Sequence, residues 1–66
     1  MIRTEQLTDL QLVAINNLYK RALETDKSQS FQSFLNLAWE DNLMGCVMIK
    51  HNGMTIGIEK DGYTHT

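Results

Sequence analysis

The residues best suited to chemistry in this 66-residue chain are one cysteine and two histidines, Cys46, His51 and His65. Zinc sites use Cys and His ligands at short, characteristic spacings, and these three residues match none of them. A histidine that acts as a general base also needs an acid or a nucleophile beside it in a pocket. Neither histidine accompanies a nucleophile motif, and the glycines form no phosphate-binding loop. The sequence therefore predicts no catalytic residue, no cofactor and no metal.

The dipeptide Asn52-Gly53 determines how these residues should face one another. Asn-Gly best fits the two positive-φ positions of a type I′ hairpin turn. This turn pairs His51 with Met54, and side-chain alternation then divides the two strands into two faces. The apolar face would carry Val47, Ile49, His51, Met54, Ile56 and Ile58, and the opposite face Cys46, Met48, Lys50, Thr55, Gly57 and Glu59.

A second turn signal, Asp61-Gly62, predicts that the last residues fold back as a third strand. A two-residue turn at this position places Tyr63 beside Lys60 and His65 beside Ile58. His65 would then share the apolar face with His51, and Cys46 would point away from both histidines.

Two helices are expected before the strands. Thr8 and Gln11 form a capping-box pattern, followed by a helical stripe of apolar residues, Leu12, Ile15, Leu18, Tyr19, Ala22 and Leu23. A second helix would begin after Ser28 or Ser30 and end near Asn42, with Phe31, Phe34, Leu35 and Ala38 facing inward. The predicted fold is one α+β domain over residues 1–66. In it, an antiparallel helix pair precedes a two- to three-stranded antiparallel meander and packs on one sheet face.

Charge and composition narrow the class of function. The formal net charge is −2, the pI is about 5.5, and the six basic residues are scattered along the chain. Nucleic-acid binders concentrate positive charge on one face, so a nucleic-acid partner is not expected. The N-terminus has no apolar signal-peptide core, and the longest nearly apolar run, residues 43–49, is too short to cross a membrane. With a single cysteine, these features favour a cytoplasmic protein.

Two groups of residues are candidates for binding a partner. Trp39, Glu40 and Asp41 would occupy the last turn of the second helix, where the helix dipole disfavours acids. Met44, Cys46 and Met48 would form an adaptable row on the outer sheet face, beside Gly57. The competing interpretation is that Trp39 closes the core and Met48 shields Gly57.

The leading hypothesis is a non-catalytic interaction protein, an adaptor or inhibitor of the kind frequent among phage and mobile-element accessory proteins. So short a chain gains little stability from its own core, which favours a protein partner and a homodimer. One alternative is nucleic-acid binding through the sheet or through Lys20, Arg21 and Lys27. Another is a toxin-like ribonuclease that uses His51 or His65 with Lys50 or Lys60.

Overall fold

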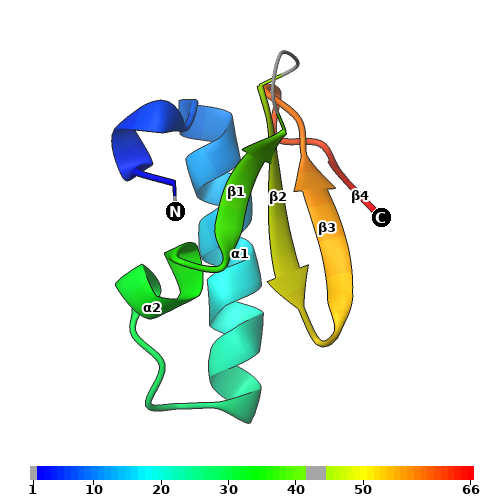
Figure 1. Cartoon of the computed structure of the whole chain (residues 1–66). Coiled ribbons are helices and arrows are strands. Elements are labelled where there is room, and N and C mark those ends of the chain that lie inside the picture. Colours follow the sequence, from blue (N-terminus) through cyan, green and yellow to red (C-terminus); the bar gives the residue numbers. More distant parts are fainter. Residues whose placement is uncertain (1, 42–44) are drawn as a thin grey trace.

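A computed structural model describes residues 2–41 and 45–66. A long helix and a short helix precede a four-stranded antiparallel sheet of strand order β1-β2-β3-β4. Helix α1 lies along one face of the sheet, and no helix of the described residues covers the other face (Figure 1). The elements are η1 (Thr4–Gln6), α1 (Asp9–Thr25), α2 (Phe31–Leu35), β1 (Ala38–Asp41), β2 (Cys46–His51), β3 (Met54–Ile58) and β4 (Thr64–His65). The predicted α+β fold class is confirmed.

The β2–β3 hairpin has the predicted turn and register. Asn52 and Gly53 both adopt positive φ, at 53° and 76°, as a type I′ turn requires. His51 pairs with Met54, and every pair up to Val47 with Ile58 follows the prediction. The central apolar positions face α1, where they complete a core that consists of Ile2, Ile15, Leu18, Phe34, Leu35, Ala38, Val47, Ile49 and Ile58.

The predicted capping box at the start of α1 is present and also fixes the sheet. The Thr8 hydroxyl accepts a hydrogen bond from the backbone amide of Gln11, and the Gln11 side-chain oxygen accepts one from the backbone amide of Thr8. The side-chain nitrogen of Gln11 then donates to the carbonyls of Gly45 and Ile58, at 3.0 and 3.1 Å. Gln11 is only 1% exposed. One residue thus caps the helix and ties it to the neighbouring ends of β2 and β3.

The predicted second helix is too long. Ser30 caps it as expected, but α2 ends at Leu35, and residues from Ala38 onward pair with β2 as strand β1. Phe34, Leu35 and Ala38 are all buried, as a helical stripe would require. This spacing is also satisfied when the chain turns after Leu35 and Ala38 enters the core from a strand opposite Ile49. The burial pattern was therefore right, but the sheet edge, a tertiary feature, decided the type of element.

The last turn differs from the prediction by one residue. Lys60, Asp61 and Gly62 form a three-residue turn, in which the Gly62 amide donates to the Glu59 carbonyl at 2.8 Å and Gly62 has a φ of 86°. Such a turn, with a left-handed glycine at its end, shifts the pairing to Ile58 with Thr64 and Gly57 with His65. A shift of one residue exchanges the faces of a strand. His65 consequently lies on the face away from α1, and its predicted place on the apolar face is wrong.

Among the residues that the structure describes, no helix has the length and apolar character needed to cross a membrane.

Candidate functional site

The sheet face turned away from α1, here called the outer face, carries a row of residues that crosses all four strands. Strand register aligns Trp39 of β1 with Met48 of β2, Gly57 of β3 and His65 of β4. The next row contains Cys46, which pairs with Asp41. Residues that the sequence assigned to two separate surfaces, a helix end and a sheet face, therefore lie on the same sheet.

Trp39 does not close the core. It is 41% exposed, and the largest fully buried side chain is that of Phe34. Glu40 and Asp41 are exposed on the same strand, with Glu40 opposite Val47 and on the other side of the sheet from Trp39. Because these acids lie in a strand, the predicted conflict with a helix dipole is absent. The group Trp39, Glu40 and Asp41 is instead part of a sheet edge.

The predicted sulfur-rich row is only partly available to a partner. Met44 falls outside the described residues, and Cys46 is 5% exposed. Met48 is half-buried, and its sulfur lies 3.7 Å from the Cys46 thiol. The imidazole of His65 covers Gly57, where an added Cβ would lie 2.6 Å from the ring carbon Cε1. Of this row, Met48 is the residue that can contribute contact area, together with Trp39 beside it.

Cys46, Glu59 and His65 form a cluster that the sequence prediction missed. The Nε2 atom of His65 lies 2.5 Å from the Glu59 carboxylate and 4.0 Å from the Cys46 sulfur. One potential ligand atom from each of the three residues lies within 4.8 Å of the others. The prediction that Cys46 points away from both histidines is wrong, because the three-residue turn moves His65 to the outer face. A Gly at the end of a possible three-residue turn was the available signal.

The cluster does not have the geometry of an activated nucleophile. In a Cys-His-acid triad, one imidazole nitrogen contacts the nucleophile and the other contacts the acid. Here Nε2 of His65 makes both contacts. Burial raises the pKa of the Cys46 thiol, and the neighbouring Glu59 raises it further through a hydrogen bond and its negative charge. These effects favour the neutral thiol, which is a poor nucleophile.

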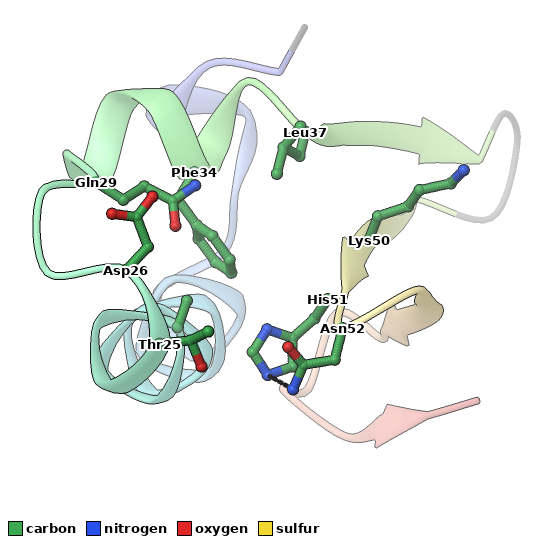
Figure 2. A pocket seen from close by; sticks show the side chains of 9 residues that line it. Thr25, Asp26, Gln29, Phe34, Leu37, Lys50, His51 and Asn52 are labelled. Atoms are coloured by element: carbon green, nitrogen blue, oxygen red, sulfur yellow. Dashed lines mark hydrogen bonds between the residues drawn. The ribbon is translucent and has the colours of Figure 1, made fainter.

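The second histidine lies at a different site, shown in Figure 2. His51 lines an open cleft of about 190 Å³ between the end of α1 and the hairpin tip. Its ring lies edge-on to the ring of Phe34, with 6.3 Å between the two ring centroids. His51 is on the side of the sheet that faces α1, whereas His65 is on the outer face. The predicted common face for the two histidines is therefore wrong, and they do not form one site.

Comparisons of the chain with protein-family models, curated proteins and solved structures find no match.

Proposed function

We propose that this chain is a non-catalytic, cytoplasmic interaction protein, an adaptor or inhibitor whose binding surface centres on Trp39 and Met48. The observation that carries the proposal is the exposure of the only tryptophan, 41%, at the edge of the sheet. Tryptophan is the residue type most enriched among interface hot spots. A methionine directly opposite it provides an adaptable apolar neighbour.

The edge of β1 supports a partner that binds as an additional strand. Within the described residues β1 pairs only with β2, which leaves its other edge available for main-chain hydrogen bonds. Glu40 and Asp41 give this strand two negative charges and no positive charge. We therefore expect the partner to present an extended segment that carries Lys or Arg near an apolar contact for Trp39.

Self-association at the same edge is less favourable because a second copy brings the same acids, and like charges across paired strands destabilise pairing. The homodimer that the sequence predicts would instead join two outer faces, where Trp39 and Met48 lie. In that arrangement the dimer and the protein partner compete for one surface. The outer face carries two acids, Asp41 and Glu59, against one base, Lys50, which does not favour the nucleic-acid alternative.

The proposal is tested by measuring how much partner protein binds to three forms of the immobilised chain. These forms are the wild type, Trp39→Ala, and Val13→Ala as a matched control. Val13 is 58% exposed on α1, distant from the outer face. Binding that depends on Trp39 should weaken by roughly 30-fold, the equivalent of about 2 kcal/mol, on its replacement. The control should bind like wild type, and circular dichroism should show that all three forms fold.

The salt dependence of the same binding tests the charge argument. Replacing Asp41 with Lys should weaken the binding of a basic partner. High salt should lower the affinity of the wild type toward that of this variant. Sedimentation equilibrium of the three forms gives the second measurement, since an outer-face dimer must dissociate in Trp39→Ala. Identical binding and identical sedimentation in Trp39→Ala and wild type would refute the proposal.

A further inference from the structure

The Cys46, Glu59 and His65 cluster combines three different metal-ligating groups at the junction of three strands. Cys46 begins β2, Glu59 follows β3, and His65 ends β4. Thiolate sulfur, imidazole nitrogen and carboxylate oxygen are the three ligand types that zinc uses in proteins. Nε2 of His65 lies close to both the sulfur and the carboxylate, and one donor atom from each residue lies within 4.8 Å of the others.

From this proximity we infer that Cys46, Glu59 and His65 form a zinc-binding site on the outer face. Ordinary zinc–ligand bond lengths in a tetrahedral site place nitrogen and oxygen about 3.4 Å apart, and sulfur and nitrogen about 3.6 Å apart. The corresponding distances are now 2.5 and 4.0 Å. The carboxylate must therefore move about 0.9 Å away from the imidazole, and the imidazole must approach the sulfur by about 0.4 Å.

The side chains that must move are the ones that are free to do so. The side chains of His65 and Glu59 are 40% and 41% exposed, so both can rotate on their solvent side, while the imidazole keeps its contacts with Gly57 and Tyr63 on the other. Cys46 is held in place by burial. Zinc would take three protein ligands here and leave a fourth position to water or to a group from a partner.

The proton balance of binding follows from the present hydrogen bonds. The thiol must lose its proton to become a ligand. A neutral His65 must move its remaining proton from Nε2, which now faces Glu59, to the other ring nitrogen. Binding of one Zn²⁺ to the neutral thiol, neutral imidazole and ionised carboxylate thus releases one proton and leaves a site with no net charge. Zinc affinity should consequently rise with pH, because each bound ion displaces one proton from the thiol.

The proposed ion would stabilise the C-terminal strand. Strand β4 has two residues and rests at the edge of the sheet, so it has few interactions of its own. A ligand from β4 joined to ligands at β2 and β3 would hold this strand in place. The thermal midpoint should therefore increase with zinc concentration and return to its initial value on addition of a chelator.

Titration of the full chain with Co²⁺ and then Zn²⁺ tests the site in the wild type and in the variants Cys46→Ser, Glu59→Gln, His65→Gln and His51→Gln. Co²⁺ bound to a thiolate absorbs in the near ultraviolet, so the wild type should show this band at one equivalent and lose it to Zn²⁺. Each cluster variant should weaken binding by more than about tenfold, the loss typical of removing even an outer-shell partner of a ligand. His51→Gln should bind like wild type because His51 lies on the other side of the sheet.

Two results would overturn the inference. One is a wild-type spectrum without a thiolate band, which would show that any bound cobalt does not contact Cys46. The other is an equal loss of affinity in His51→Gln and His65→Gln, which is the behaviour of nonspecific histidine binding. Glu59→Gln and His65→Gln change partly exposed side chains, so the test remains valid even when Cys46→Ser does not fold.

Discussion

Replacing Gln11 should destabilise this protein far more than a capping residue normally would. The Gln11 side chain accepts one hydrogen bond from Thr8 and donates two to the carbonyls of Gly45 and Ile58, in a position that is 1% exposed. A capping interaction contributes about 1 kcal/mol, and each further hydrogen bond contributes about 1 kcal/mol. Gln11→Leu should therefore lower the free energy of unfolding by about 3 kcal/mol.

Gln6 provides a matched control, because it forms an equivalent cap without the buried donors. Its side-chain oxygen accepts a hydrogen bond of 2.8 Å from the backbone amide of Arg3, in an exposed position. Gln6→Leu should cost about 1 kcal/mol or less. A domain of this size has about 3–5 kcal/mol of stability from one core. The Gln11→Leu variant should therefore have a free energy of unfolding close to zero, with a substantial unfolded population at room temperature.

Two glutamate variants separate the cap of Gln11 from its link to the sheet. Gln11→Glu keeps an oxygen for the Thr8 amide but replaces the donor with a second acceptor that faces two carbonyls. It should still lose about 2 kcal/mol or more, because a buried carboxylate would face two carbonyl oxygens, whereas Gln6→Glu should be close to neutral. Urea denaturation followed by circular dichroism measures all four variants. If the Gln11 and Gln6 variants of each pair were equally stable, the assignment of two buried hydrogen bonds to Gln11 would be wrong.

Two further predictions concern a turn and the cysteine. Gly62→Ala should lower the free energy of unfolding by about 2 kcal/mol or more, since φ is 86° and the new Cβ would lie 2.9 Å from the Leu10 carbonyl oxygen. Gly53→Ala, at a φ of 76° but with no atom within 4 Å, should lose about 1 kcal/mol in the same urea assay; equal losses would contradict the close approach. Burial raises the pKa of the Cys46 thiol above its ordinary 9.0, so the unfolded chain loses this proton at a lower pH than the folded chain does. The neutral thiol therefore contributes stability that is fully present below pH 9.0 and is lost as the pH rises through the raised pKa. Urea midpoints of wild type should therefore fall more between about pH 8 and about pH 10 than those of Cys46→Ala, and parallel curves would contradict this.

The parts of the fold that could be predicted from the sequence are those that local chemistry determines. Asn52-Gly53 admits one favourable hairpin turn, and the apolar alternation on both sides agrees with the same register. Thr8 and Gln11 likewise specify the start of α1 through contacts within four residues. In both places several independent signals point to one structure, and this agreement is what makes a local prediction reliable.

The secondary structure of residues 36–41 could not be predicted in the same way. Phe34, Leu35 and Ala38 have the spacing of a helical stripe, and this spacing fits the core equally well when a strand begins after residue 37. The choice is made by β2, which offers an unpaired edge to this segment. The candidate binding surface therefore differed from the prediction in its geometry, although the structure places Trp39 and Met48 on one surface.

The contact of His65 with Cys46 depends on the choice between a two-residue and a three-residue turn at Asp61-Gly62. Both forms accept a glycine with positive φ, so the dipeptide alone does not distinguish them. The first turn of α1 supplies the difference. The Thr8 hydroxyl donates to the Lys60 carbonyl at 2.7 Å, and the backbone of Leu10 packs against Gly62. These contacts hold the first and last residues of the three-residue turn in place, and the resulting shift of one residue carries His65 to the outer face. The proposed metal site on that face is thus a consequence of how the N-terminus of a helix on the opposite face is capped.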